Sequence, residues 1–225
     1  MRTIFVSNKI PYDTIEIFED MGLDWVFLPS DPTLPEPVSC HADMLMFGNI
    51  LQKDYYKRNK ELFEGYDIVL AEEEFGNEYP KDVLLNAFAV GDTLFGRLES
   101  LSDKVKKLYP KSVNLRQGYA KCSTLLFGNN AITADKGIGS VLTEHGLNVL
   151  IITSGHIALP GYDYGFIGGA SFVYKNIVYF FGDLEKHPDC VKIRNFIEDA
   201  GYVPAYDIDY PLTDFGGAII LDKKH

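Results

Sequence analysis

Four side chains in this sequence could together perform nucleophilic chemistry. Cys40, His41 and Asp43 lie within four residues of one another, and Cys122 follows much later in the chain. A thiol becomes a strong nucleophile when a histidine removes its proton and a carboxylate orients that histidine. Cys122 or Cys40 with His41, oriented by Asp43, is therefore a candidate catalytic arrangement.

The same residues have two other interpretations. Cysteine, histidine and aspartate are all competent metal ligands, but their number and spacing do not require a metal, and we expect none. Alternatively, the two cysteines are small buried residues and His41 is a satisfied polar group at the end of a loop. The glycine pairs at 168–169 and 216–217 lack the strand–loop–helix context of a phosphate-binding loop, so no cofactor is expected.

A second candidate site is the aspartate between two tyrosines. Asp163 is flanked by Tyr162 and Tyr164. A carboxylate beside aromatic rings suits a cationic ligand, through ion pairing and cation–π contact. The alternative is a turn aspartate next to two packing tyrosines. Asp214 lies in an acidic segment that could make the mouth of a pocket negative, or could be part of a solvated loop.

The elements that must position these residues follow a repeating pattern. Two short apolar runs are joined by a tight turn, then an amphipathic helix and a third apolar run follow. Copies recur roughly every 45 residues, a spacing typical of propellers and arrays. The turns are Phe47-Gly48-Asn49, Val90-Gly91-Asp92, Phe127-Gly128-Asn129 and Tyr174-Lys175-Asn176.

This pattern predicts an α/β domain over residues 1–225, built as a five-fold pseudosymmetric propeller of ββαβ units. The fifth unit is split: a strand at 218–221 has no room for a helix after it, and the N-terminus supplies the missing parts. Pairing the two ends would leave no exposed terminal sheet edge. The predicted units are residues 43–85, 86–122, 123–168, 169–215, and 216–225 together with 1–42.

Several local predictions can be checked against the structure. We expect helices at 12–21, 55–63, 98–108 and 188–200, and a further helix capped by Asp135. We expect a strand at 44–47, and a strand at 149–152 that is buried on both faces. An ordinary doubly wound sheet is the alternative fold, but a parallel sheet would have single strands where this chain has hairpins.

Composition limits the partners. The net charge of −11 disfavours nucleic acid and anionic membranes, and a small-molecule ligand and a homodimer remain the possible partners. Three cysteines without paired spacing give neither a disulfide framework nor a zinc ribbon. A reducing cytoplasm is the simplest location, since the first residues are too soon polar for a signal peptide.

Five such units resemble the pentein fold of the guanidino-group-modifying enzymes. That superfamily includes arginine and agmatine deiminases, dimethylarginine hydrolases and amidinotransferases, and one non-catalytic member, the ribosome anti-association initiation factor. Gly155, the segment 159–170 and the late pair Gly216-Gly217 are together similar to a bacterial branch of that fold. The resemblance implies a central site where the first strands of the units begin.

The resemblance also implies which residues would form that site. The family nucleophile follows a late glycine run and matches Leu221 or Ile220, and the family histidine matches Gly168 or Gly169. The family's acidic segment matches 121–123 and is also changed. Asp43 is retained where a substrate-binding aspartate would stand. The candidate ligand-binding residues are Asp43, Asn86, Ser123, Asp163, Tyr164 and Asp214.

Three functions are consistent with this sequence. The first is a non-catalytic or divergent pentein protein that binds a small cationic or amino-acid-like ligand, such as a guanidine, in a central acidic and aromatic pocket. The second is a hydrolase or amidinotransferase-like enzyme with relocated chemistry at Cys122 or Cys40. The third is a protein-interaction module like the initiation factor.

Overall fold

The computed structural model describes residues 2–224, which form five separate three-stranded sheets. In every sheet the middle strand pairs antiparallel with one neighbour and parallel with the other. A tight turn can join an antiparallel pair, whereas a parallel pair needs a longer crossover. The five sheets therefore share one connectivity.

Four of the sheets follow one another along the chain. Each begins with a hairpin and ends with the strand that returns parallel to the hairpin's second strand. Their strands are β3 (Met46–Phe47), β4 (Ile50–Gln52) and β5 (Val69–Ala71); β6 (Phe88–Val90), β7 (Thr93–Gly96) and β8 (Lys111–Asn114); β9 (Thr124–Phe127), β10 (Asn130–Thr133) and β11 (Asn148–Ile151); and β12 (Ser171–Tyr174), β13 (Ile177–Phe180) and β14 (Val203–Tyr206).

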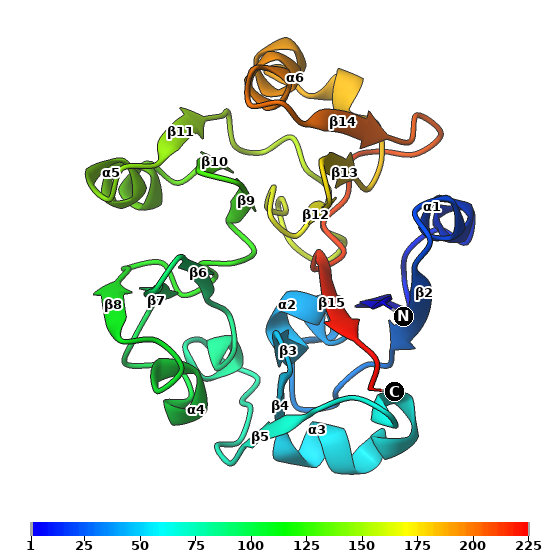
Figure 1. The fold of residues 1–225 in the computed structure, drawn as a ribbon, viewed down its shortest axis with the longest axis vertical. Coiled ribbons are helices and arrows are strands. Elements are labelled where there is room, and N and C mark those ends of the chain that lie inside the picture. Colours follow the sequence, from blue (N-terminus) through cyan, green and yellow to red (C-terminus); the bar gives the residue numbers. More distant parts are fainter. Residues whose placement is uncertain (1, 225) are drawn as a thin grey trace.

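The fifth sheet joins the two ends of the chain. β15 (Ala218–Asp222) pairs antiparallel with β1 (Arg2–Ser7), and β1 pairs parallel with β2 (Asp24–Leu28). The predicted pairing of the two ends is thus confirmed. In Figure 1 the sheets lie around a common centre, with the red β15 beside the blue N-terminal strands.

The four hairpin turns are confirmed at the predicted positions. Gly48, Gly91 and Gly128 have φ between 53° and 58°, and Lys175 reaches 54° in the fourth hairpin. Two-residue hairpin loops need positive φ because their twist must match that of the strands. Glycine provides this conformation without strain, and Lys175 is the one non-glycine residue with positive φ among residues 2–224.

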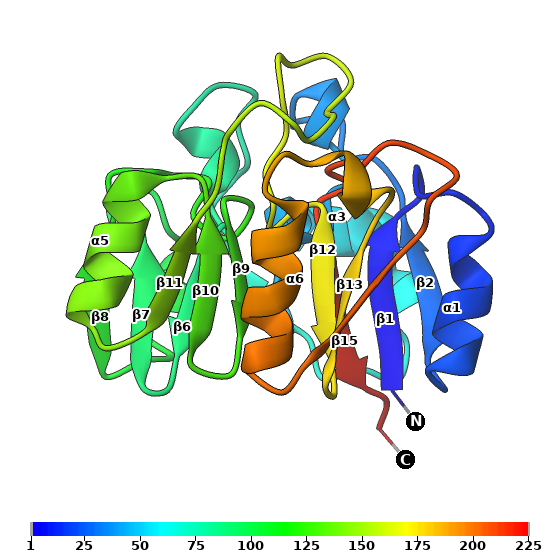
Figure 2. The ribbon, with the colours of Figure 1, turned by 90° about the horizontal axis from the view of Figure 1, so that it is seen from above.

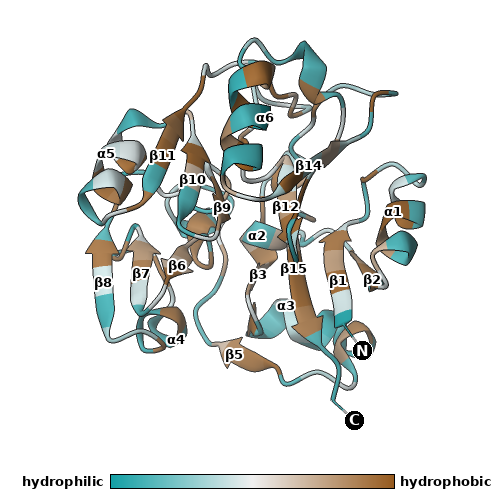
Figure 3. Ribbon diagram, turned by 45° about the horizontal axis from the view of Figure 1, so that its top comes forward, coloured by the Kyte–Doolittle hydropathy of each residue, from teal (hydrophilic) through white to brown (hydrophobic). Residues whose placement is uncertain are grey.

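A helix makes the crossover to the third strand in each sheet. These helices lie on the outside of the molecule (Figure 1), and their outer faces are hydrophilic while most strands are hydrophobic (Figure 3). The helices are α1 (Thr14–Asp20), α3 (Lys53–Arg58), α4 (Asp103–Lys106), α5 (Lys136–Glu144) and α6 (Cys190–Asp199); α2 (Ala42–Leu45) lies before β3, and 3₁₀ turns span Glu36–Val38, Lys60–Phe63, Lys81–Val83 and Leu184–Lys186.

Two of the predicted helices are wrong in length. The helix expected at 98–108 is only α4, because Ser102 caps it by accepting a hydrogen bond from the Lys104 N–H at 3.2 Å. The helix expected at 55–63 is split into α3 and a 3₁₀ turn. The cap at Asp135 is confirmed, since its side chain accepts from the Ile138 N–H at 2.9 Å.

Two strand predictions also need correction. Met44 and Leu45 belong to α2, so β3 has only two residues. β11 is not buried on both faces, and Ile151 is 41% exposed. The reason is that β11 is the outer strand of its sheet, where one edge and part of one face meet solvent.

The long loop before β12 stands at the end of the molecule opposite both termini (Figure 2). It carries the Tyr162-Asp163-Tyr164 segment toward the centre of the ring of sheets. Within residues 2–224, no helix combines the length and the apolar character that crossing a membrane would require.

Candidate functional site

The centre of the molecule is a circuit of hydrogen bonds that links all five sheets. Each bond joins the segment before one sheet's first strand to the corresponding segment of its neighbour. The bonds run from the Asn86 side chain to Asp43 O (3.0 Å), Lys121 N to the Asn86 side chain (2.8 Å), Gly169 N to Cys122 O (3.0 Å), Gly217 N to Gly169 O (2.7 Å) and Asp43 N to Gly216 O (3.0 Å). Asn86 is therefore a scaffold residue that bridges backbone groups.

Glycines at the centre leave no room for a side chain. A Cβ atom on Gly168 would lie 2.3 Å from the Lys121 carbonyl oxygen, and one on Gly169 would lie 2.0 Å from Asp214 Oδ1. These are the two positions that the resemblance matches to the family histidine. No histidine could stand at either without moving the neighbouring backbone or Asp214.

Asp214 and Asp43 form a buried acidic pair. Asp214 is 2% exposed and accepts hydrogen bonds from Phe166 N and Gly216 N, both at 2.9 Å. Burial, and then the charge of Asp43, raises the pKa of Asp214 to about 7. Burial also raises the pKa of Asp43, and the charge of Lys121 partly opposes this. At neutral pH the pair therefore carries fewer than two negative charges.

Asp43 has unused hydrogen-bonding capacity. Neither of its carboxylate oxygens has a partner within the described residues. The Cys122 thiol lies near enough to lower the pKa of Asp43, but outside normal hydrogen-bond geometry. A buried carboxylate without donors is costly, so Asp43 is a candidate to receive a donor from outside the chain.

His41 is neutral and lacks a partner for one ring nitrogen. Its Nδ1 lies 3.7 Å from Asp214 Oδ1 and makes no hydrogen bond within the part of the chain that the structure describes. Burial, and then the charge of Lys9, lowers the pKa of His41 to about 3. His41 faces Asp214 rather than Asp43, so the predicted triad order of Cys122, His41 and Asp43 is not the one that the chain adopts.

Cys122 has the wrong electrostatics for an activated nucleophile. Burial, followed by the charges of Asp43 and Asp214, raises the pKa of its thiol well above the ordinary value. Asn86 Nδ2 lies 2.9 Å from Cys122 Sγ and opposes this only partly. Reactive cysteines need electropositive surroundings, and those of Cys122 are acidic.

Iodoacetamide at pH 7.5 is therefore expected to modify Cys122 slowly. Cys40 is also buried, and Cys190 is the most accessible of the three cysteines. Peptide mass spectrometry over a time course should show Cys190 labelled first and Cys122 at least about ten-fold more slowly, since only the thiolate reacts. Fast, selective labelling of Cys122 would instead support an enzyme whose catalytic chemistry is relocated to Cys122.

A cavity of about 230 Å³ opens above these groups. His41, Cys122 and Asp214 contribute to its polar wall, and Asp163 lies at its rim. The remaining wall is largely aromatic, from Tyr119, Tyr162, Tyr164 and Phe166. Ligand sites commonly combine apolar and aromatic walls with a few polar groups that converge.

The aromatic wall is held in place by its neighbours. Tyr119 stacks on Phe166 with ring centroids 6.2 Å apart, and Tyr164 meets Phe166 edge to face at 6.1 Å. The Tyr119 hydroxyl donates to the buried carboxylate of Asp82. Tyr162 and Tyr164 are 47% and 42% exposed, so they flank the entrance.

The structure brings some of the predicted residues together and separates others. His41, Cys122, Asp163, Tyr164 and Asp214 line the cavity, and Asp43 lies behind Cys122. Three candidates lie elsewhere. Asn86 is buried in the scaffold, Cys40 Sγ contacts Ser7 Oγ at 3.0 Å, and Ser123 lines a different pocket.

Leu221 lies in β15, four residues beyond Gly217, and does not line the central cavity. It pairs with Thr3 of β1 and packs on a core cluster that includes residues of β4 and β5. The segment before β15 places Asp214 and Gly216 at the centre, so the last unit contributes a carboxylate there. The described residues also contain no group of three side chains suited to a metal ion.

Three residues of the site and its support, Tyr119, Phe166 and Asp82, are not predicted by any pattern in the sequence. Tyr119 and Phe166 lie in irregular segments without periodicity. The only signal was their position next to predicted strand starts, at 121–123 and 168–169.

Solved structures similar to this one are dimethylarginine hydrolases. A DDAH from Pseudomonas aeruginosa, a cysteine-to-serine variant complexed with citrulline, matches with a TM-score of 0.54 and 13% identity, covering 97% of this chain and 98% of that chain. A dimethylarginine dimethylaminohydrolase, a histidine-to-glycine variant with an S-methyl-L-thiocitrulline adduct, matches with a TM-score of 0.53 and 14% identity. A dimethylarginine dimethylaminohydrolase adduct with 4-chloro-2-hydroxymethylpyridine matches with a TM-score of 0.52 and 12% identity. Each of these two matches covers 92% of this chain and 92% of the other chain.

These likenesses confirm the expected resemblance to the pentein fold, and at such low identity they show the fold alone. A comparison with curated proteins gives no match. The model of a family of unknown function, DUF6873, matches residues 5–219. Because this match spans nearly the whole sequence, the chain belongs to the DUF6873 family.

Proposed function

We propose that this protein is a non-catalytic pentein that binds a small cationic, amino-acid-like ligand, such as a guanidine, in the central cavity. The observation that carries the proposal is a buried acidic pair beside an open, aromatic cavity: Asp214 lines the cavity wall, Asp43 lies behind it, and burial together with the charge of Asp43 raises the pKa of Asp214. The finer architecture belongs to the same proposal: five pseudosymmetric units around one axis, supported by the shared connectivity of the sheets and the circuit of central hydrogen bonds.

The charges favour a cation. The described residues place two buried carboxylates at the centre, and the only cation that acts on both is the half-buried Lys121, whose Nζ donates to Gly168 O at 3.4 Å. A ligand cation next to Asp214 would favour the ionised form of both acids. Its binding would thus be coupled to proton release.

The cavity shape favours a flat cation. A planar guanidinium can stack on aromatic rings and donate to a carboxylate in a forked geometry, which an ammonium cannot do. Phe166 and Tyr119 provide stacked rings beside Asp214. The compounds bound in two of the similar structures, citrulline and S-methyl-L-thiocitrulline, are amino acids, which supports an amino-acid-like ligand here.

The two other functions receive less support. A relocated cysteine enzyme would need a thiolate at Cys122, whose surroundings favour the thiol. A pure protein-interaction module would have a centre filled with apolar side chains, whereas this centre has an open cavity of about 230 Å³ with the Asp214 carboxylate in its wall.

Thermal unfolding with a matched pair of ligands tests the proposal. Arginine and agmatine carry a guanidinium, and citrulline replaces it with a neutral group of nearly the same shape. We expect the two guanidines at 5 mM to raise the melting temperature, by about 2–4 °C for each kcal/mol of binding energy, and citrulline to have little effect. If citrulline stabilises the protein as much as arginine does, or if no guanidine stabilises it, the proposal is wrong.

A further inference from the structure

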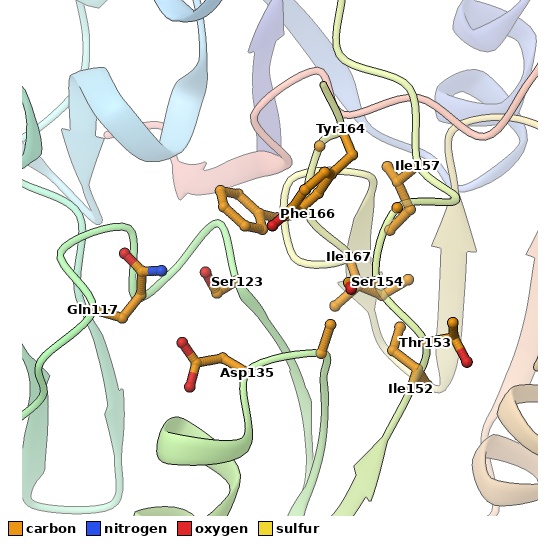
Figure 4. A pocket seen from close by; sticks show the side chains of 13 residues that line it. Gln117, Ser123, Asp135, Ile152, Thr153, Ser154, Ile157, Tyr164, Phe166 and Ile167 are labelled. Atoms are coloured by element: carbon orange, nitrogen blue, oxygen red, sulfur yellow. The ribbon is translucent and has the colours of Figure 1, made fainter. Parts of the chain in front are cut away.

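A second pocket lies on the other side of the Tyr164–Phe166 wall. It measures about 180 Å³ and lies between the N-terminal end of α5 and the segment after β11. Figure 4 shows Gln117, Ser123 and Asp135 along one side, with the rings of Tyr164 and Phe166 at one end. Neither Asp43 nor Asp214 lines this pocket.

Ser123 is the observation that points to a ligand here. Ser123 is 3% exposed and lines the pocket, and its Oγ has no hydrogen-bond partner among residues 2–224. Buried hydroxyls are nearly always satisfied, so an unpaired one next to an open pocket indicates a missing partner. A ligand hydroxyl could supply either the donor or the acceptor.

The other polar groups offer both donors and acceptors. Asp135 Oδ1 accepts from the Ile138 N–H, and Gln117 Oε1 accepts from the Tyr119 N–H at 3.1 Å. These bonds fix the two side chains and leave the second carboxylate oxygen and the amide N–H groups for a ligand. Ser154 adds a hydroxyl on the facing side.

Charge narrows the ligand class. None of the described residues that line the pocket is a lysine or arginine, so a phosphate or carboxylate group would find no counter-charge. A cation would find one carboxylate, that of Asp135, and one oxygen of this carboxylate already accepts a hydrogen bond as the helix cap. An uncharged polyhydroxyl compound matches the mixture best, because each of its hydroxyls both donates and accepts, and its C–H face can pack on the aromatic rings.

We propose that this pocket binds a small uncharged polyhydroxyl ligand of monosaccharide size. Ser123, Asp135 and Gln117 hold its hydroxyls, and Tyr164 and Phe166 cover its apolar face. Tyr164 and Phe166 line both pockets, so occupancy of one would change the wall of the other.

A ¹H–¹⁵N NMR titration of the full chain tests this site. The probes are D-glucose, D-ribose and myo-inositol, with D-glucose 6-phosphate and putrescine as charged comparisons. We expect at least one neutral probe to bind saturably and to shift the amide signals of Ser123, Asp135 and Ser154 more than those of Asp163 and Asp214. The proposal is overturned if no neutral probe saturates, or if a charged probe binds this pocket more tightly.

Two variants and a matched control sharpen the test. Ser123→Ala removes a hydroxyl without a protein partner, so it should leave folding intact and weaken the neutral probe at least five-fold. Asp135→Asn keeps a good helix cap and should weaken binding of the neutral probe to a similar extent. Thr124→Val removes a second unpartnered buried hydroxyl that lines neither pocket, and should leave binding unchanged. Binding that survives Ser123→Ala at full strength would overturn the assignment.

Discussion

Replacing Gly216 with alanine is expected to destabilise the protein by about 3–4 kcal/mol, the sum of an overpacking cost and a backbone cost. A Cβ atom there would lie 2.2 Å from His41 Cβ and 2.5 Å from His41 Cα. Both atoms are fixed to the backbone at the start of α2, so His41 cannot rotate away. The residue also has φ of +80°, which strains any side chain other than glycine.

A second glycine separates the clash from the strain. Gly201 has the same φ of +80°, but nothing lies within 4 Å of a Cβ placed on it. Gly201→Ala should therefore cost only about 1 kcal/mol, the backbone contribution. Urea unfolding of the two variants measures the difference directly. Equal losses of stability would mean that the contact between Gly216 and His41 is looser than the structure indicates.

The same contact couples the fold to the site. Gly216 N donates to Asp214, and Gly216 O accepts from the amide of Asp43. A shift of this residue would move both acids as well as His41. Gly216→Ala should therefore weaken ligand binding even where the protein remains folded, whereas Gly201→Ala should not.

The architecture was predictable because short-range chemistry determines it. Turn residues between apolar runs mark the hairpins, and the lack of a helix after residues 218–221 required the N-terminus to complete the fifth sheet. The errors arose where the tertiary environment decides. Residues 149–152 are uniformly apolar, yet β11 lies at the outer edge of its sheet. No local pattern indicates which edge of a sheet a strand occupies.

The site was only partly predictable for a geometric reason. Neighbouring residues at the centre point in different directions: Cys122 lines the central cavity and Ser123 the second pocket, while Cys40 contacts Ser7 and His41 faces Asp214. Sequence proximity identified the right segments but could not assign each side chain to a cavity. The role of Asp214 also depends on burial, which the acidic segment around it did not reveal.

Asp214→Asn is expected to reduce the affinity for a cationic ligand by at least about 30-fold at pH 8, since losing one partner of a buried charge pair costs about 2–5 kcal/mol. Asp163→Asn removes the same charge at the exposed rim, where solvent screens it, and should reduce affinity less than about three-fold. Isothermal titration with arginine or agmatine compares them. Equal effects of the two substitutions would place the cation at the rim instead.

The pH dependence gives an independent check on Asp214. Only the ionised carboxylate pairs with a cation, and the pKa of Asp214 is about 7 in the free protein. Affinity should therefore rise from pH 6 to pH 8 and level off above that, and Asp214→Asn should flatten the profile. A profile that is flat in the original protein would mean that Asp214 is already ionised at pH 6.

Stability without ligand should change in the opposite direction. Burial raises the pKa of Asp214 in the folded state above its unfolded value of 3.8, so the folded protein holds a proton that the unfolded chain has released. Stability from this group is thus lost as pH rises toward and through 7. Below about pH 7 the lowered pKa of His41 acts oppositely, because the unfolded chain then binds a proton that the folded protein does not.

The informative window is therefore about pH 7–8, where His41 is neutral in the folded state and mostly neutral in the unfolded chain, so that the acidic pair dominates. Across it, the midpoint of urea unfolding should fall for the ligand-free protein. A bound cation neutralises the negative charge that Asp214 and Asp43 gain as pH rises. A saturating guanidine should therefore remove most of the fall in the urea midpoint. Only a ligand that contacts the acids can do this. A ligand at the rim would stabilise the protein about equally at both ends of the window.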